Sequence, residues 1–173
     1  AVGDDVAVPS TVGMFGTDDL ADAEIDLLAI VLGDGCVAPG QTSATFTTAL
    51  DDVREVANQA ARSLGTDLRV EGPAGAATTY RFSAGYRGGL TNPVTELLRA
   101  HGMWGKGAHD KQVPDAVFRC SRPTVARFLN RLFATDGTAW VATAGYARIG
   151  YSSVSKELVD GVAHLLRRFG LRV

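Results

Sequence analysis

Long apolar runs are missing from this sequence of 173 residues, and cysteine and histidine are scarce. No uncharged apolar run comes near the roughly 18 to 20 residues that a membrane-spanning helix needs. No basic segment followed by an apolar stretch, the mark of a secretory signal, opens the chain. We therefore expect a globular, cytoplasmic protein without a membrane partner. Its 46% of apolar residues are enough for one core, or for a core shared by two similar halves.

The two cysteines, Cys36 and Cys120, lack the close spacing of zinc and redox motifs and are too few for a disulfide framework. We expect both to be buried, reduced thiols. The three histidines, His101, His109 and His164, lack the spacing of metal ligands. None of these five residues is a candidate for a functional site.

An excess of basic residues, which most DNA-binding proteins have, is also missing, because the net charge is −2. The charges are unevenly distributed along the chain. Residues 1–70 contain 12 acidic and 3 basic side chains, whereas residues 71–173 contain 7 acidic and 14 basic ones. A chain divided in this way can present one basic face, or its charges can simply solvate two helical surfaces.

Apolar periodicity and turn residues predict an α+β fold in which one set of elements occurs twice. The first set is a helix at 25–35 with Asp18 or Asp22 as its cap, a hairpin at 36–48, a helix at 51–64, a hairpin at 68–83 and a helix at 92–101. A glycine-rich loop and a brief helix at 115–118 come next. The second set is a helix at 121–137, a hairpin at 139–152 and a helix at 155–168. We divide the chain into a connector at 1–17 that contains a short strand, a first repeat at 18–120 and a second repeat at 121–173.

The repeat is most distinct where a helix ends in Asp-Gly. Asp34 and Asp136 occupy this place, 102 residues apart. Each helix also has small or short residues four positions apart near this end, and this spacing lets two helix backbones approach closely. They are Ala29 and Gly33 in one helix, and Asn130 and Ala134 in the other. If the two helices pair around a pseudo-two-fold axis, the two acids lie side by side.

Two adjacent carboxylates at the negative ends of helices repel each other, which disfavours ionisation unless a cation lies between them. Divalent ions held by two carboxylates and a phosphate can activate water and stabilise a leaving oxygen, as in phosphodiester hydrolysis. A single Asp-Gly after a helix is an ordinary stop signal. The matched pair, Asp34 and Asp136, therefore predicts a metal site.

Two nonamers carry a resemblance to a known family. LLAIVLGDG at 27–35 and LNRLFATDG at 129–137 resemble the two signature motifs of LAGLIDADG homing endonucleases. GKGAHDKQVP at 105–114 is similar to the Gly-Lys…Lys-x-Ile/Val-Pro block of members that occur in inteins, and residues 151–170 resemble the helix that follows the second motif. The resemblance covers nearly the whole chain.

This resemblance implies a pseudo-two-fold fold of αββαββα repeats whose sheets lie on double-stranded DNA. It assigns Mg²⁺ or Mn²⁺ to Asp34 and Asp136, with Gly33 and Thr135 beside them, and both DNA strands are then cut across the minor groove. Lys111 matches the basic residue that these enzymes place near the scissile phosphate, where a cation can balance developing charge. The alternative for Lys111 is a solvated loop lysine.

The predicted hairpins supply candidate DNA contacts, because strand side chains alternate between the groove and the helices. The candidates for base or phosphate contact are Tyr80, Arg81, Tyr146 and Arg148. Candidates for phosphate neutralisation alone are Arg87, Lys106, Arg119 and Arg122. Each hairpin residue can equally be an ordinary exposed strand residue.

The second repeat departs from the family pattern because it is incomplete. Lys111 lies 77 residues after Asp34, and the matching place after Asp136 is position 213, beyond Val173. Either the sequence is part of a larger protein, or this copy is truncated and lacks half of its DNA surface; we favour the first. Residues 3–9 resemble the segment that leaves the N-terminal splicing half of an intein, so a splicing domain in the same precursor is the expected partner. Residues 113–118 are similar to actinobacterial inteins in replicative DNA helicases, although no splicing nucleophile is present.

The leading hypothesis is a monomeric, metal-dependent DNA endonuclease. One alternative is a LAGLIDADG-derived module, such as a regulator, a maturase or a decayed endonuclease, that binds nucleic acid without cutting it. A second alternative is an α+β domain without a nucleic-acid role.

Overall fold

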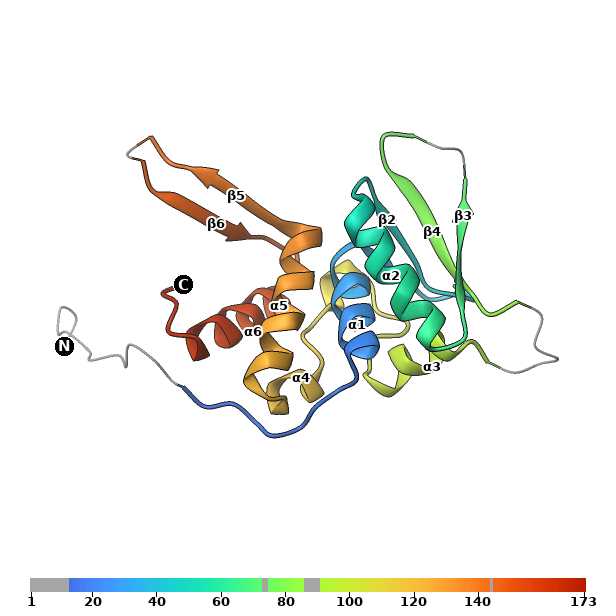
Figure 1. Cartoon of the computed structure of the whole chain (residues 1–173), viewed down its shortest axis with the longest axis horizontal. Coiled ribbons are helices and arrows are strands. Elements are labelled where there is room, and N and C mark those ends of the chain that lie inside the picture. Colours follow the sequence, from blue (N-terminus) through green and yellow to red (C-terminus); the bar gives the residue numbers. More distant parts are fainter. Residues whose placement is uncertain (1–12, 73–74, 86–90, 144) are drawn as a thin grey trace.

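The computed structural model describes residues 13–72, 75–85, 91–143 and 145–173, and it confirms the α+β class (Figure 1). The helices are α1 (Asp22–Asp34), α2 (Asp51–Ser63), α3 (Pro93–Ala100), α4 (Asp115–Arg119), α5 (Arg122–Asp136) and α6 (Lys156–Arg168), with a short 3₁₀ helix at Ala108–Asp110. The strands are β1 (Gly35–Cys36), β2 (Thr45–Thr48), β3 (Asp67–Glu71), β4 (Thr78–Ser83), β5 (Gly137–Val141) and β6 (Ala147–Tyr151). The strand expected near the start of the chain and Arg87 lie outside the described residues.

The strands form two antiparallel sheets. One has the order β1-β2-β4-β3, and the other is the β5-β6 hairpin. The sheets lie on opposite sides of the α1–α5 pair and diverge from the end of that pair at which both helices finish (Figure 1). The strands that follow α1 and α5 therefore both begin at the base of the angle between the sheets.

Helix α1 is the centre of the core. Its apolar pattern predicts one buried side, carrying Ile25, Leu28, Ala29 and Leu32, but every residue from 25 to 33 is buried. The reason is that α1 packs against α2, α3 and α5 and also against β2. The predicted cap is wrong as well. The helix begins at Asp22 itself, after Ala21, and no side chain caps it; the backbone N–H of Ala21 donates to Glu24 at 3.2 Å.

One charged cluster lies in the α1–α5 interface. Asp26 is 4% exposed, and its carboxylate accepts two hydrogen bonds from Arg127, at 2.8 and 2.7 Å, and one from Arg131, at 3.1 Å. Arg127 also reaches the exposed Asp22 at 2.7 Å. Because a buried carboxylate must find donors, this cluster fixes how far α5 can slide along α1.

The cysteines differ in burial. Cys120 is buried and Cys36 is exposed, and both are free thiols. The expectation of a buried thiol is wrong for Cys36 because β1 is the edge strand of its sheet. Among the helices that the structure describes, none has the length and apolar character that crossing a membrane requires.

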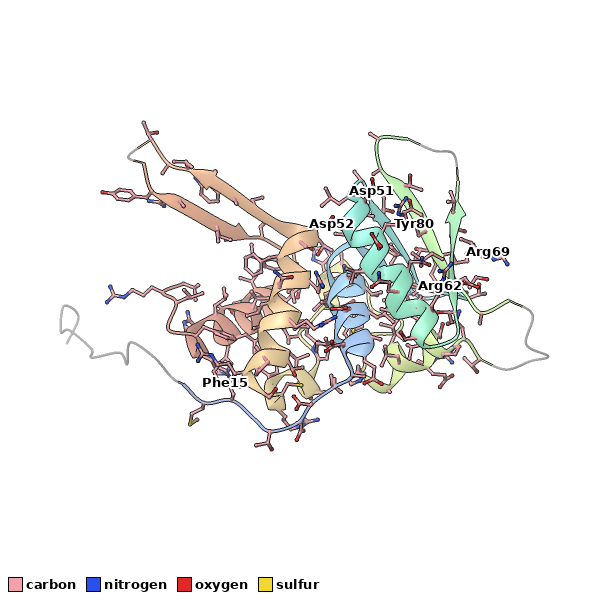
Figure 2. All side chains as sticks on the ribbon, in the orientation of Figure 1. Phe15, Asp51, Asp52, Arg62, Arg69 and Tyr80 are labelled. Carbon is pink, nitrogen blue, oxygen red and sulfur yellow. The ribbon has the colours of Figure 1, made fainter. Side chains whose placement is uncertain are left out.

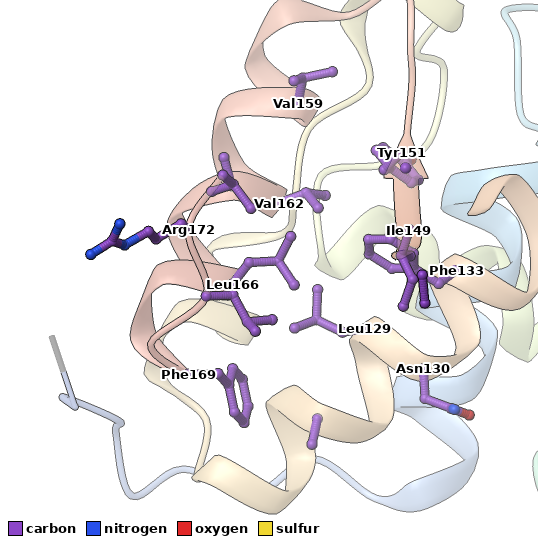
Figure 3. A pocket seen from close by; sticks show the side chains of 16 residues that line it. Leu129, Asn130, Phe133, Ile149, Tyr151, Val159, Val162, Leu166, Phe169 and Arg172 are labelled. Atoms are coloured by element: carbon purple, nitrogen blue, oxygen red, sulfur yellow. The ribbon is translucent and has the colours of Figure 1, made fainter. Parts of the chain in front are cut away.

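The two halves cover their central helices differently. Helix α2 packs closely on α1. In the second half, a groove of about 940 Å³ separates α5 and β6 from α6 (Figure 3). Its walls are mainly apolar, and they include Leu129, Phe133, Ile149, Val162, Leu166 and Phe169. The first half places four strands beside its central helix, and the second half has two within the described part of the chain.

Candidate active site

The two predicted acids lie at the same end of a pair of contacting helices. Asp34 is the last residue of α1 and Asp136 the last of α5. The contact is closest at Gly33, where an added Cβ would lie 2.8 Å from Cβ of Thr135 and 3.5 Å from Oδ2 of Asp136. No side chain larger than hydrogen fits there without displacing α5. The absence of a side chain at Gly33 therefore lets the two helix ends touch.

Lys111 reaches the same place from a distant loop. Its ammonium group donates a hydrogen bond to the backbone carbonyl of Gly33 at 2.6 Å. The loop is held by Gly105, whose N–H donates to the carbonyl of Val37 at 2.8 Å, and by Ser155, whose hydroxyl donates to the carbonyl of Lys111 at 2.5 Å. Ser155 is buried at the start of α6. Residues from both halves thus hold the lysine beside the acids.

The electrostatics of these three groups are coupled. Burial raises the pKa of Asp34, the charge of Asp136 raises it further, and Lys111 opposes both effects. Burial also raises the pKa of Asp136, again opposed by Lys111. The pKa of Lys111 is lowered by burial, against the attraction of both carboxylates. Two acids share one ammonium group, so the fully ionised site has an excess negative charge that a divalent cation can neutralise.

This charge excess predicts that, without divalent cations, the site lowers the free energy of unfolding by an amount that depends on pH. A carboxyl group whose pKa is higher in the folded state stabilises the fold at low pH, and this contribution is lost as pH rises through the folded pKa. We expect Asp136→Asn to be more stable than the wild type at pH 7 in a chelator, because the remaining Asp34 is balanced by Lys111. The stability advantage of Asp136→Asn should shrink as the pH falls toward 3.8, the ordinary pKa of the Asp136 carboxyl. Urea unfolding at several pH values measures it, and equal stability at pH 7 would contradict it.

The donor atoms at this place fit a hard cation. Carboxylate oxygens suit Mg²⁺ and Mn²⁺, which commonly keep several water or phosphate ligands. No group of three or more acidic, histidine or cysteine side chains able to hold a metal occurs in the described ranges, so water and phosphate have to complete the coordination of an ion held by Asp34 and Asp136. The Thr135 hydroxyl donates to the Leu132 carbonyl at 2.7 Å, and the Gly33 carbonyl already accepts from Lys111. A ligand role for Gly33 and Thr135 remains a prediction.

Two predicted DNA contacts, Tyr80 and Arg81, are neighbours on strand β4 of the larger sheet. Neighbouring residues of a strand point to opposite faces, so Tyr80 and Arg81 cannot both face a groove. The Tyr80 ring packs against the core, 5.5 Å from the Phe46 ring, so it does not share the outer face with Arg81, and its contact with DNA stays a prediction. Arg81 belongs to the other face, where its Nε donates to Glu71 at 3.1 Å and where its register partner is Arg69.

The β5–β6 hairpin presents a second outer face. Arg148 pairs in register with Trp140, and Tyr146 is 68% exposed beside the turn. Trp140 is 49% exposed, and its ring covers Gly150, where an added Cβ would lie 3.1 Å from the ring. Trp140 was not among the DNA contacts predicted from the sequence. The signal was available, since the predicted hairpin places Trp140 opposite Arg148.

The basic residues predicted to neutralise phosphate fall into two groups. Lys106 lies in the same loop as Lys111, and both line a small cavity with Val37. Arg119 bonds to Asp18 at 3.4 Å, and the Arg122 guanidinium lies 5.9 Å from the centre of the Phe15 ring, at the far end of the helix pair (Figure 2). Since α5 begins at Arg122 and rises 1.5 Å per residue, about 20 Å separates that end from Asp136. The structure does not bring Arg119 and Arg122 to the acids.

The second half of the chain matches a known protein family. Residues 123–173 match the LAGLIDADG-like domain family. The matched segment contains all but the first residue of α5, together with β5, β6 and α6, and therefore includes Asp136 and its Gly137. This match confirms the resemblance for the part of the chain that it covers.

Longer proteins are similar to almost the whole chain. The chain is 29% identical to replicative DNA helicase DnaB of Rhodothermus marinus, with 98% of the chain and 18% of that protein aligned. It is 30% identical to Protein RecA of Mycobacterium bovis, over 98% of the chain and 21% of RecA. For the DnaB helicase of Synechocystis, the identity is 26% over 96% of the chain and 20% of the helicase. The chain thus spans about a fifth of the length of these relatives.

Proposed function

We propose that this chain is the homing-endonuclease domain of an intein, and that it binds double-stranded DNA and hydrolyses its phosphodiester bonds with Mg²⁺ or Mn²⁺. One observation carries the proposal. Two half-buried carboxylates, Asp34 and Asp136, end two contacting helices of like position, and the partly buried Lys111 lies beside them.

Each of the three side chains has a distinct role in this proposal. Asp34 and Asp136 hold the divalent cation, and their raised pKa values mark the charge that the cation relieves. When bound, the cation supplies a more acidic water and neutralises charge on the leaving oxygen. Lys111, kept in place by the Gly33 carbonyl, balances the charge that develops on the scissile phosphate.

The outer faces of the two sheets form the proposed DNA surface. Arg81 and Arg69 lie on one face, and Arg148 and Trp140 on the other, on either side of the carboxylate pair. Tyr146 and Lys106 extend this surface. Arg81 has to give up its hydrogen bonds with Glu71 before it can contact a base or a phosphate.

The intein setting is also part of the proposal. The similarity to a replicative helicase and to RecA covers nearly all of this chain and about a fifth of each relative, as expected for a segment inserted into different hosts. We propose that residues 1–17 connect to a splicing domain, and that 18–120 and 121–173 are the two repeats. Because one chain supplies both acids, a monomer is sufficient for the site.

Cleavage of a duplex that contains the vacant insertion site tests the proposal. We expect the wild-type chain, within its full precursor, to cut this duplex in Mg²⁺ or Mn²⁺ and to leave it intact in a chelator. A duplex interrupted by the inserted sequence serves as the control substrate and should not be cut.

Two other results would assign the chain to the alternative hypotheses. A gel shift on the vacant site without cleavage in either metal would indicate a binding module. DNA binding that does not weaken between 50 and 200 mM salt, roughly the range over which phosphate contacts are screened, would indicate no nucleic-acid role.

A further inference from the structure

Tyr151, at the end of β6, has a buried hydroxyl group that the fold does not use. Its oxygen is shielded from solvent and has no hydrogen-bond partner among the described residues. Buried polar groups without a partner are rare in folded proteins, because each loses its bonds to water and gains none in return. Packing alone therefore does not explain the hydroxyl group of Tyr151.

Tyr151 lies next to the end of α5 that carries Asp136. Tyr151 is the cross-strand partner of Gly137, the residue directly after Asp136. Its ring lies 5.4 Å from the ring of Phe133 on the last turn of α5 (Figure 3). Burial first, and then the charges of Asp136 and Asp34, raise the pKa of the phenol above its ordinary value. The group thus remains a neutral hydrogen-bond donor at physiological pH.

The other half of the molecule shows what packing alone requires. There, Phe46 is the cross-strand partner of Gly35, which directly follows Asp34. A phenyl ring fills this place and stacks on the ring of Phe82 at 5.4 Å. An aromatic ring is therefore sufficient at this register position, and of the two residues compared only Tyr151 adds a hydroxyl group.

We propose that Tyr151 is a positioning residue of the metal centre, whose hydroxyl donates a hydrogen bond to the carboxylate of Asp136, directly or through one water, when a divalent cation is bound. The inference rests on the proposed function. Carboxylates that ligate metals are usually held by such outer donors, and loss of the donor lowers metal affinity by about 10- to 100-fold. The donor orients Asp136 while leaving its other lone pairs to the cation.

The test compares Mn²⁺ binding by the wild type, Tyr151→Phe, Tyr146→Phe and Asp136→Asn, without DNA, through the water proton relaxation of bound Mn²⁺. We expect Tyr151→Phe to bind Mn²⁺ about tenfold more weakly and to unfold at the same temperature or a higher one. The exposed Tyr146 lies in the same hairpin, so Tyr146→Phe should match the wild type. Addition of Mn²⁺ should also change the near-ultraviolet tyrosine spectrum of the wild type but not that of Tyr151→Phe.

The possible outcomes separate this inference from the proposed function. If Asp136→Asn loses Mn²⁺ binding while Tyr151→Phe keeps wild-type affinity, the role of Tyr151 is overturned and the metal centre stands. If the wild type binds no Mn²⁺, or Asp136→Asn binds it equally well, the metal centre itself fails and the role of Tyr151 fails with it.

Discussion

Asp34→Asn and Asp136→Asn are each expected to lose at least about a thousandfold of the DNA cleavage rate, while DNA affinity stays within a few fold. An amide in place of either acid halves the anionic charge that holds the cation. A bound cation supplies several kcal/mol of transition-state stabilisation, and about 4 kcal/mol corresponds to a thousandfold in rate. Single-turnover cleavage in Mg²⁺ measures the rate, and a gel shift in Ca²⁺ measures the affinity.

A matched acidic control separates this effect from a general loss of charge. Asp160 pairs with Lys156 on the exposed face of α6, so Asp160→Asn should cut at the wild-type rate. If either Asp34→Asn or Asp136→Asn cleaved at the wild-type rate, the carboxylate pair would have no part in the reaction. Such a result would also remove the main support for a nuclease.

Asp26→Ala is expected to lower the free energy of unfolding by about 3 kcal/mol, the lower end of the cost of breaking a buried ion pair. The Asp26 side chain is 5% exposed, whereas its partners Arg127 and Arg131 retain 33% and 30% exposure. Without Asp26, Arg131 loses its carboxylate partner inside the α1–α5 interface and Arg127 keeps only the exposed Asp22. Water reaches both arginines in part, which moderates the cost.

Asp22→Ala provides the control for this prediction, because Asp22 also pairs with Arg127 but its side chain is 77% exposed. Exposed pairs contribute roughly 0 to 1 kcal/mol, so this variant should unfold close to the wild type in urea. Equal destabilisation by Asp22→Ala and Asp26→Ala would show that burial of the pair is not what stabilises the helix contact.

Much of the secondary structure was predictable because it depends on local signals. Asn92 before Pro93 begins α3, and the Asn92 side chain accepts from Val94 at 2.9 Å, as an N-cap residue does. The prediction was wrong at the start of α1, where Asp18 accepts from Arg119 at 3.4 Å and Asp22, already inside the helix, accepts from Arg127 at 2.7 Å. A contact with a distant segment replaced the local cap.

The site was predictable in its parts and not in its surroundings. The matched Asp-Gly pair indicated which acids belong together, but nothing local indicated that the Lys111 side chain would donate a hydrogen bond to the Gly33 carbonyl. Tyr80 and Arg81 were predicted together as DNA contacts, although strand alternation alone separates them onto opposite faces. Which of the two faces the core was decided by Phe46, because the Tyr80 ring packs against it.

The sequence by itself determined the order of helices and hairpins, the duplicated Asp-Gly ends and the resemblance to one family, because these depend on residue type and spacing along the chain. Only the tertiary structure decided that Gly33 touches Thr135, that Asp26 accepts from both Arg127 and Arg131, and that the Tyr151 hydroxyl is buried without a hydrogen-bond partner among the described residues. These properties arise from burial and from contacts between residues roughly 100 positions apart. Periodicity carries no information about which distant surfaces meet.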